Sequence, residues 1–411
     1  MKIDLILPTK IENDWKDYLK SIVSNSLLEI FEPIILDFIK ELSSFILKDK
    51  SLRTYKELVA MAYWLRQKHI LEIKNEFEKQ TIGLYFKPRG VVLHFAPSNV
   101  DTIFVYSWLI SMLMGNINIL RVSQKNSEQF KILMNIINKI LDKDKFLEIK
   151  KRTFIISYEH DDLITQELSS VCDLRVIWGG DETIKKIRSI PIPPNANELV
   201  FPDKFSISAF QSESINNLND NEFNNLISSF YNDAYYFDQM ACSSPKLIIW
   251  IGESKEIVKA KSKFWEKLEL FVNQKNLQFD DSLEMTKMVT TFYYASNDNV
   301  KDITFDNKTN IHRIDIKNID NSIKNAHCGG GLFLEAQRDS LLSILDLLDK
   351  KDQTLSIFGF SEDDIKSLFY SLKNKTIDRI VPIGQSLNFN NIWDGYNLPI
   401  YFSRQISIIY K

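Results

Sequence analysis

The sequence predicts an α/β fold in which helices cover both faces of a mostly parallel sheet. Short apolar runs of strand type alternate with longer amphipathic segments of helical period. The strands are apolar throughout rather than at every second residue, which is typical of parallel strands buried on both faces. Because 411 residues are too many for one ordinary core, roughly two or three domains are expected.

The first half of the chain supplies the first α/β series. Residues 14–47 and 55–77 are expected to be helical, because apolar residues recur there at intervals of three and four. Strands and helices alternate from residue 90 onward. The expected strands are 90–95, 117–122, 154–157 and 174–178, and the later expected helices are 127–141, 162–169 and 182–187.

An uncharged run at residues 102–120 is long enough to raise the question of a membrane span, which needs ~20 mostly apolar residues. Polar residues interrupt the run, and Gly115-Asn116 is typical of a turn. A buried helix followed by a buried strand therefore explains the run better than a transmembrane helix.

A second α/β series begins near Lys204, after the proline-rich linker 190–195. Its expected helices are 221–240, 255–273 and 362–374, and its expected strands are 246–251, 332–335 and 355–359. We therefore divide the chain into residues 1–85, 86–203, 204–385 and a C-terminal tail, 386–411.

Composition and charge narrow the class of protein. Hydrophobic residues make up 44% and charged residues 26%, as in folded globular proteins, and the net charge of −3 gives no reason to expect nucleic acid as a partner. The three cysteines form no CxxC pair, so neither a disulfide framework nor a metal site is expected. Free thiols and the lack of a secretory signal favour a reducing, cytoplasmic location.

Cys242 is the candidate nucleophile. It lies where a predicted helix ends and a predicted strand begins, so backbone on both sides can hold the thiol; a small buried core residue is the alternative. Cys328 is a rival beside His327, but sequence neighbours usually point apart, and the following three glycines are expected to form a loop entering a strand. Cys172 is expected in the core. The five scattered histidines are each expected to be structural.

The ends of three predicted strands are the candidate binding site, because parallel sheets bind ligands at the carboxyl ends of their strands. These ends carry Ala96-Pro97-Ser98-Asn99, Arg121-Val122-Ser123-Gln124 and Gly179-Gly180-Asp181-Glu182. The last of these places two glycines before a helix whose amides could face a phosphate, although the chain has no GxGxxG motif.

Four blocks of sequence resemble a known family. They are residues 90–100, 115–121, 241–245 and 378–385 with 393–396. Together they resemble the acyl-CoA reductases (fatty acid reductases, LuxC-type) of bacterial bioluminescence systems, a divergent branch of the aldehyde-dehydrogenase superfamily. The resemblance implies a Rossmann-type dinucleotide-binding domain over residues 86–203, preceded by a helical N-terminal segment, and a catalytic domain over residues 204–385.

The resemblance also implies roles for individual residues. Cys242 falls on the nucleophile, and Asn99 on the asparagine whose amide, with the Cys242 N–H, binds the oxyanion. Arg121 and Gln124 replace a lysine and a glutamate that contact the adenosine ribose. Losing the carboxylate and gaining a guanidinium favours a 2′-phosphate, hence NADPH. The remaining implied cofactor residues are Ala96, Pro97, Ser123, Gly179, Gly180 and Glu182.

One departure from the superfamily favours thioester chemistry over aldehyde oxidation. The glutamate that activates water in aldehyde-oxidising relatives should fall near Val200, and Glu198 lies two positions early. An enzyme that exchanges its acyl group with a thiol does not need that base. The implied reaction is reduction of a long-chain acyl-CoA to the aldehyde through a Cys242 thioester.

The implied partners are an acyl-CoA or acyl-protein donor, an acyl-protein synthetase and a second copy of the chain. Two other functions remain open from the residues alone. They are a cysteine-dependent acyltransferase or thioesterase without redox activity, and a non-catalytic partner of an acyl-protein synthetase.

Overall fold

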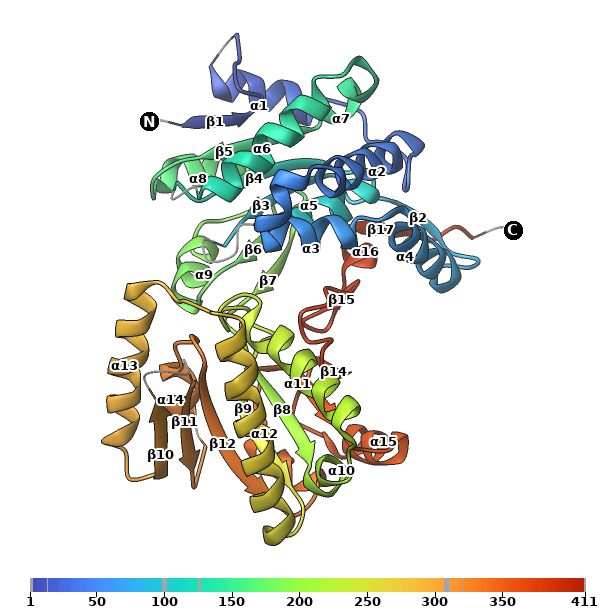
Figure 1. Ribbon diagram of the computed structural model, residues 1–411. Coiled ribbons are helices and arrows are strands. Elements are labelled where there is room, and N and C mark those ends of the chain that lie inside the picture. The colour runs from blue at the N-terminus through green and yellow to red at the C-terminus, as the bar shows by residue number, and fades with distance from the viewer. Residues whose placement is uncertain are drawn as a thin grey trace. The chain divides into compact units, whose positions relative to one another are not determined.

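The structure is a computed structural model that describes residues 3–12, 14–97, 102–124, 127–306, 311–319 and 321–409. The chain forms two compact units, of which the first comprises Met1–Asp203 with Phe389–Lys411 and the second Lys204–Asn388. Each unit has its own sheet with helices against it (Figure 1). The predicted α/β class is therefore confirmed.

The first unit contains a six-stranded sheet in the order β1-β5-β4-β3-β6-β7. β1 is antiparallel to β5 and the other strands are parallel. Strand order runs outward in both directions from the β3–β6 pair, which makes that pair the switch point of the sheet. The bounds are β1 Asp4–Leu7, β3 Val91–Phe95, β4 Ile117–Val122, β5 Thr153–Ser157, β6 Leu174–Trp178 and β7 Asn197–Phe201.

Helices cover both faces of this sheet. Trp15, Leu19 and Ile22 of α1 pack with apolar residues of α8 and α9 against one face, and α5 lies against β3 and β4. The bounds are α1 Trp15–Val23, α2 Pro33–Lys48, η1 Lys50–Thr54, α3 Lys56–Trp64, α4 Gln67–Gln80, α5 Ile103–Leu113, α6 Glu128–Leu141, η2 Asp144–Phe146, α7 Leu147–Lys150, α8 Asp162–Ser169 and α9 Asp181–Arg188.

The uncharged run resolves into α5 and β4, as the sequence predicted. Gly115 between them has φ +80°, and the side chain of Asn116 accepts from the Gly90 N–H and donates to the Ser111 carbonyl. The polar interruptions therefore satisfy the backbone of a turn. In the part of the chain that the structure describes, no helix has the length and apolarity that crossing a bilayer needs.

The C-terminal segment belongs to the first unit. Phe389 stacks on Tyr106 with ring centroids 4.7 Å apart and accepts a hydrogen bond from the Trp64 indole. The bounds are β2 Tyr85–Pro88, β15 Ile392–Trp393, β16 Tyr396–Asn397, α16 Leu398–Tyr401 and β17 Ser403–Ile406, with β17 antiparallel to β2 and β16 antiparallel to β15.

The second unit contains a seven-stranded sheet in the order β10-β11-β12-β9-β8-β13-β14, with β10 antiparallel and the rest parallel. The strands are β8 Phe205–Gln211, β9 Pro245–Ile251, β10 Val300–Asp306, β11 Ile311–Ile316, β12 Leu332–Arg338, β13 Asp352–Phe358 and β14 Arg379–Pro382. The helices are α10 Ser212–Asn216, α11 Asp220–Tyr235, α12 Ser254–Gln274, α13 Asp281–Ala295, α14 Asn321–Ala326, η3 Leu342–Leu347 and α15 Glu362–Ser371.

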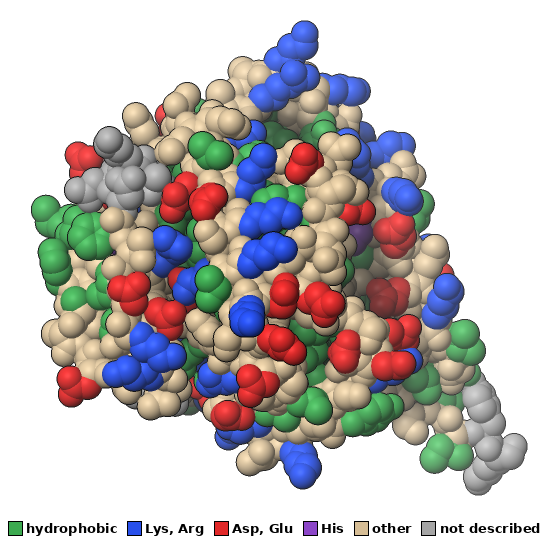
Figure 2. Space-filling model, turned by 60° about the horizontal axis from the view of Figure 1, so that its bottom comes forward, with side chains coloured by type: hydrophobic (Ala, Val, Ile, Leu, Met, Phe, Trp, Pro, Cys, Tyr) green, Lys and Arg blue, Asp and Glu red, His purple; other side chains and the backbone are tan. Residues whose placement is uncertain are grey.

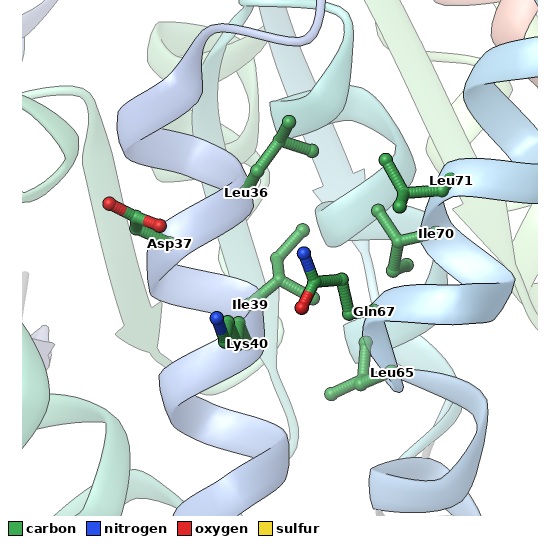
Figure 3. A pocket seen from close by; sticks show the side chains of 8 residues that line it. All are labelled: Leu36, Asp37, Ile39, Lys40, Leu65, Gln67, Ile70 and Leu71. Atoms are coloured by element: carbon green, nitrogen blue, oxygen red, sulfur yellow. The ribbon is translucent and has the colours of Figure 1, made fainter.

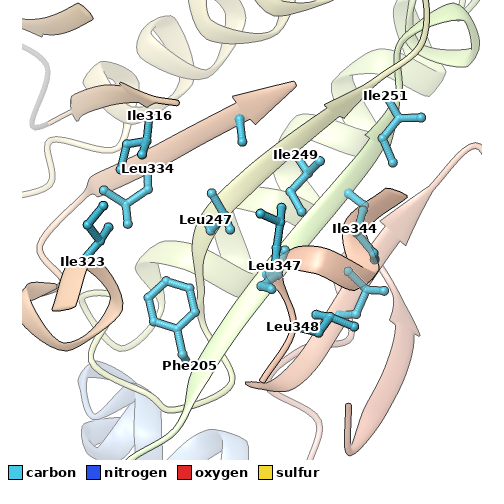
Figure 4. Close-up of a cluster of buried hydrophobic side chains, with 14 of the residues drawn as sticks. Phe205, Leu247, Ile249, Ile251, Ile316, Ile323, Leu334, Ile344, Leu347 and Leu348 are labelled. Atoms are coloured by element: carbon cyan, nitrogen blue, oxygen red, sulfur yellow. The ribbon is translucent and has the colours of Figure 1, made fainter. Parts of the chain in front are cut away.

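Both faces of the second sheet are packed with apolar side chains. Figure 4 shows one face, where Leu247 and Ile249 of β9 lie near Ile323, Ile344 and Leu347 from the covering helices. The other face carries an aromatic cluster from the sheet, α11 and α12. The side chains alternate between the two clusters along β9, which explains why that strand is apolar at every position.

The helix before Cys242 is shorter than the sequence predicted, as is the helix expected over 362–374, which ends at Ser371. The amphipathic pattern predicted a helix over 221–240, but α11 ends at Tyr235. Asp238 and Gln239 have φ values of 51° and 61°, and a right-handed helix cannot continue through such residues. The last five residues of the predicted helix are therefore turns that lead toward Cys242.

Candidate active site

Cys242 lies in the turn that joins α11 to β9, with its side chain half-buried. Its Sγ accepts a hydrogen bond from Nε2 of Gln353 at 3.3 Å, and its carbonyl oxygen accepts from Oγ of Ser206 at 2.7 Å. The Ser206 hydroxyl in turn accepts from the Thr354 N–H at 3.2 Å. Strands β8 and β13 thus hold both the backbone and the sulfur of this cysteine.

Gln239 ties the turn to the glycine segment before β12. Its fully buried amide donates to the carbonyls of Pro245 and Leu332, at 2.8 and 2.9 Å, and accepts from the Gly331 N–H at 2.9 Å. Because a buried amide is costly to leave unpaired, these three bonds fix the path of the chain on either side of Cys242.

The glycine segment 329–331 packs directly on this turn. Gly329 has φ +79°, and a Cβ there would lie 2.8 Å from Sδ of Met240 and 3.2 Å from the Gln239 carbonyl oxygen. The Gly330 N–H donates to the carbonyl of Asp238 at 2.9 Å. The predicted loop entering a strand is confirmed, and it also supports the turn that carries Cys242.

The other two thiols have surroundings that suppress ionisation. Burial raises the pKa of Cys172 to about 12, and its Sγ lies 3.3 Å from the Ser169 carbonyl oxygen. Burial also raises the pKa of Cys328, which packs against the core of the second unit. Since the thiolate is the reactive form, neither cysteine is suited to be a nucleophile at neutral pH.

His327 is structural, as predicted. Its Nε2 lies 2.8 Å from the Leu332 carbonyl, and its Nδ1 accepts from the Gly329 N–H at 3.1 Å. Desolvation lowers its pKa to about 3, so the ring is neutral and both nitrogens are used to hold the glycine segment.

His94 and His312 are buried and neutral in the same way. His94 lies between Ser107 and Asn118, and His312 bonds to Thr291. Burial lowers the pKa of each ring to about 4. Among the described residues, no group of three or more His, Cys, Asp or Glu side chains could hold a metal ion.

The predicted cofactor residues follow neighbouring strands of the first sheet. Phe95 at the end of β3 is in register with Arg121 of β4 and Ile177 of β6, and the Ala96 N–H donates to the Arg121 carbonyl at 2.9 Å. The structure thus brings the described members of the set to the carboxyl edge of the sheet, at its switch point. They are Ala96, Pro97, Arg121, Ser123, Gln124, Gly179, Gly180 and Glu182. Asn99 lies outside the described residues.

The glycine pair at this edge leaves room at the start of α9. Gly180 is the N-cap of α9, and a Cβ built on it would meet no atom within 4 Å. The Gly179 N–H donates to the Phe201 carbonyl at 3.2 Å, and a Cβ there would make ordinary contact with Thr183. Glu182 is 87% exposed at its side chain and pairs with Lys185 at 2.7 Å.

The two predicted ribose-contacting residues also have partners. Nη2 of Arg121 donates to the Tyr158 carbonyl at 3.2 Å, and its guanidinium lies 5.5 Å from the centre of the Tyr158 ring. The Gln124 amide donates to a carboxylate oxygen of Asp4 at 3.4 Å. Asp4, on β1, therefore places a negative charge beside Gln124 that the sequence did not predict.

Both carboxylate oxygens of Glu198 accept hydrogen bonds from arginines. Its Oε1 accepts from Nε of Arg175 at 2.8 Å, and its Oε2 accepts from Nε of Arg188 at 3.3 Å. Val200, two positions later on β7, packs against the core of the first unit. Neither side chain is therefore placed as a base that could activate water.

The surface shows two further features. Figure 3 shows a hollow between α2 and the start of α4, lined by Leu36, Asp37, Ile39, Lys40, Leu65, Gln67, Ile70 and Leu71. The described members of the predicted sites do not line it. On the face shown in Figure 2, basic and acidic side chains are interspersed, in keeping with the small net charge.

Gln353, Ser206 and Gln239 were not predicted as functional. The sequence carries no signal for Gln353, because 111 positions separate it from Cys242 and only the pairing of β13 with β8 brings them together. The only local signal for Gln239 is its place at the end of an amphipathic pattern.

Comparisons with known proteins agree with the fold. The chain is 10% identical to the NAD-dependent aldehyde dehydrogenase from Sinorhizobium meliloti, with a TM-score of 0.67 over 96% of this chain and 87% of that one. For an aldehyde dehydrogenase from Mycobacterium tuberculosis solved with NAD+ the identity is 11%, the TM-score 0.64 and the coverage 96% and 89%. The predicted aldehyde-dehydrogenase-like fold is confirmed.

Two curated relatives match part of the chain. One, from Aliivibrio fischeri, is a "long-chain acyl-protein thioester reductase", 26% identical over 47% of this chain and 36% of its own length. The other, "long-chain acyl-protein thioester reductase 2" from Photobacterium leiognathi, is 28% identical over 41% of this chain and 34% of its own length. The match thus spans about a third of these relatives.

The family comparison covers nearly the whole chain. Residues 11–401 match the family described as Acyl-CoA reductase (LuxC). That range includes Cys242, every strand of the six- and seven-stranded sheets except β1, and the segment 378–396 that carried part of the resemblance. The chain therefore belongs to the acyl-CoA reductase (LuxC) family.

Proposed function

We propose that this chain reduces a long-chain acyl thioester to the aldehyde through a covalent thioester on Cys242. The observation that carries the proposal is the contrast among the three thiols. Cys242 is half-buried and held by a hydrogen-bond donor, whereas burial raises the pKa of Cys172 and Cys328. Family membership and the names of the two curated relatives support the reaction.

The acyl donor is either acyl-CoA or an acyl-protein thioester. The family description favours acyl-CoA, and the curated relatives are named for acyl-protein thioesters. Both donors present the same thioester carbonyl to a thiolate, so one chemistry serves both. We propose the long-chain acyl thioester as the substrate class. An assay with both carriers distinguishes acyl-CoA from an acyl-protein thioester.

The first unit is suited to bind a nicotinamide dinucleotide. Gly180 leaves open space in front of the N-terminal amides of α9, where a phosphate is favoured, and Arg121 supplies a permanent cation at the same edge. Ala96, Pro97, Ser123, Gly179 and Glu182 are the other residues that we propose to line this site. When bound, the nucleotide supplies the hydride that acyl transfer alone lacks.

Cys242 acts twice in the proposed mechanism. Its thiolate attacks the thioester carbonyl, and the carbon–sulfur bond to the donor breaks. The donor leaves as a thiolate, and the acyl group stays on Sγ. When the aldehyde forms, the bond from carbon to Sγ breaks and the thiolate is restored. We propose that Asn99 and the Cys242 N–H donate to the carbonyl oxygen while it carries negative charge.

Glu198 has no part in this mechanism. A hydrolytic base would release the acyl group as a carboxylate before it could be reduced. The ion pair of Glu198 with Arg175 removes the nearest glutamate from that role. This favours the reductase over an aldehyde-oxidising enzyme.

Nucleotide preference depends on two opposed features. Arg121 and the uncharged Gln124 favour the 2′-phosphate of NADPH, whereas the Asp4 carboxylate beside Gln124 repels it. We propose NADPH, since the replacement of a carboxylate by Gln124 lies at the ribose-contacting position itself. Asp4→Asn should then strengthen NADPH binding, and Gln124→Glu should weaken it relative to NADH.

We propose two protein partners. An acyl-protein synthetase would present the acyl group as a protein thioester, as the names of the curated relatives suggest. A second copy of this chain would cover the exposed side chains of the β2–β17 pair, among them Tyr85 and Ile406. Ile406→Lys should reduce the mass seen by light scattering if this surface pairs two copies.

One assay tests the function. NADPH oxidation is measured with acyl-CoAs of graded length and with an acylated protein thiol, for wild type and Cys242→Ala. We expect oxidation and aldehyde formation by the wild type with long chains, and none by Cys242→Ala. Thiol release without NADPH oxidation would instead identify a thioesterase or acyltransferase, and inactivity of both with every donor would favour the non-catalytic partner.

A further inference from the structure

Gln353 is a fully buried amide on β13 that contacts the sulfur of Cys242. Its Nε2 donates to Sγ at 3.3 Å, and its Oε1 accepts from Oγ1 of Thr354 at 3.3 Å. An amide removed from water needs such partners, because leaving one unpaired costs about 1–3 kcal/mol. This buried amide therefore uses one of its N–H donors to bind the sulfur of a cysteine.

The backbone around Gln353 keeps the amide in place. The Gln353 carbonyl accepts from the Asp378 N–H at 2.9 Å, and the following residue, Thr354, donates its N–H to Ser206. The preceding residue, Asp352, pairs with the buried Lys324 at 2.6 Å. Because Ser206 also donates to the Cys242 carbonyl, the amide and the cysteine backbone are fixed to the same pair of strands.

A thiolate at Cys242 needs a donor of this kind. Many reactive cysteines lie at the N-terminus of a helix, whose positive end stabilises the anion. Cys242 instead lies in a turn seven residues after α11 ends at Tyr235, so α11 offers its thiolate no positive helix end. An N–H donor on Sγ favours the charged form over the neutral thiol, and it does so without a titration of its own.

We propose that the amide of Gln353 stabilises the thiolate of Cys242 and aims its sulfur, an inference that rests on the proposed role of Cys242 as nucleophile. The same hydrogen bond serves both halves of the reaction. It keeps the thiolate populated before attack, and it stabilises the thiolate again when the bond from carbon to Sγ breaks. While the acyl group is on the sulfur the bond weakens, because a thioester sulfur is a poor acceptor.

The test is the pH dependence of alkylation of Cys242 by iodoacetamide, followed by mass spectrometry of the peptide that contains it. It needs neither nucleotide nor acyl donor. Gln353→Met keeps the length of the side chain and removes the donor. We expect its alkylation at pH 7 to be about tenfold slower than in the wild type, with the midpoint of the rate profile about one pH unit higher.

Two further variants make the result specific. Gln353→Glu places a carboxylate against the sulfur and should move the midpoint higher than Gln353→Met does. Thr354→Val, which removes the hydroxyl on Oε1 and leaves the donor in place, should shift the midpoint by less than a third as much. Unfolding curves identify the variants that keep the wild-type fold, and the comparison uses those.

The wild type alone also tests the inference. Its midpoint must lie below about 8.5, where an unperturbed thiol titrates. A wild-type midpoint at or above that value, or superimposable profiles for wild type and a folded Gln353→Met, would overturn the inference. If the profiles shift as expected but no acyl thioester is reduced, the proposed role of Gln353 holds and the proposed function is wrong. If an acyl thioester is reduced but the profiles do not shift, the proposed function holds and the proposed role of Gln353 is wrong.

Discussion

Arg175 donates from Nε to Oε1 of Glu198 at 2.8 Å, from a side chain that is 1% exposed to one that is 18% exposed. Arg175 also donates to the hydroxyl of Ser169 and the carbonyl of Ile190. The pair joins β6 to β7, where the two residues are in register. Glu198 therefore compensates a buried cation.

Glu198→Gln should destabilise the protein without a selective effect on acyl transfer. Removing the carboxylate leaves a buried guanidinium without its counter-charge, which costs about 3 kcal/mol. Arg188→Gln is the matched control, because Arg188 is 59% exposed and binds the same carboxylate, so its loss should cost about 1 kcal/mol or less. Urea unfolding measures both. A stable Glu198→Gln that cannot release its acyl group would show that Glu198 is a base after all.

Gly180→Ala should weaken nucleotide binding and leave stability unchanged. The backbone of Gly180 has ordinary dihedrals, and a Cβ would meet no protein atom within 4 Å. Any loss must therefore come from a ligand that approaches this backbone. A fluorescence titration with NADPH measures the nucleotide affinity, and a thermal melt measures the stability. Unchanged nucleotide affinity would move the proposed phosphate site away from the start of α9.

Gly329→Ala should slow acyl transfer and leave nucleotide affinity unchanged. Its positive φ and the approach of Met240 and Gln239 leave no room for a methyl group. The turn that carries Cys242 must then move, so we expect the rate of acyl transfer to fall at least tenfold while nucleotide affinity is unchanged. Both are measured on protein that keeps its wild-type circular dichroism. Full acyl transfer by this variant would mean that the glycine segment does not support the turn.

Acid should destabilise both units between about pH 6.5 and pH 4. Burial lowers the pKa of His94 and of His312 to about 4, so the folded state resists protons that the unfolded chain accepts below about 6.5. The contribution of each ring to stability is therefore complete above pH 6.5 and is lost as pH falls toward 4, by at most about 3 kcal/mol. Burial raises the pKa of Asp233 and of Asp352 in the second unit to about 6, and their protonation in the folded state offsets part of the loss there. Unfolding by urea at pH 7.5 and pH 5 measures the loss.

His94→Asn tests that cause. The amide can still bond to Ser107 and Asn118, and it does not titrate in this range. The pH dependence should flatten in this variant, whereas His160→Gln, which changes an exposed residue, should leave it as in the wild type. An undiminished acid sensitivity in His94→Asn would assign the effect to other groups.

Local pattern predicted the interior of the fold well. The bounds of β4, β6 and α8 match the sequence prediction, because strands buried on both faces are apolar at every position and α8 begins at an aspartate cap. Strands at or near the edges of the sheets were not predicted, and neither was β8 inside the second sheet. β7 begins with Asn197 and Glu198 and follows a proline-rich linker, and β10 and β11 contain charged residues, so none of them resembled the buried strands.

The site was predicted unevenly for a related reason. Cys242 and the strand-end residues stand next to local signals, namely a junction between two elements and glycine at the end of a strand. Gln353 and Asp4 became neighbours of Cys242 and Gln124 through the pairing of distant strands. Rules based on local sequence cannot predict such contacts. Gln239 lies at the end of a helical sequence pattern, and that pattern gave no sign of its positive φ.

The most direct test of the account is the mass of the protein after incubation with a long-chain acyl-CoA in the absence of nucleotide. We predict one acyl group per chain, located on the peptide that contains Cys242, absent from Cys242→Ala, and discharged as aldehyde when NADPH is added. An acyl group on Cys328, or an acylated Cys242 that NADPH does not discharge, would contradict the account.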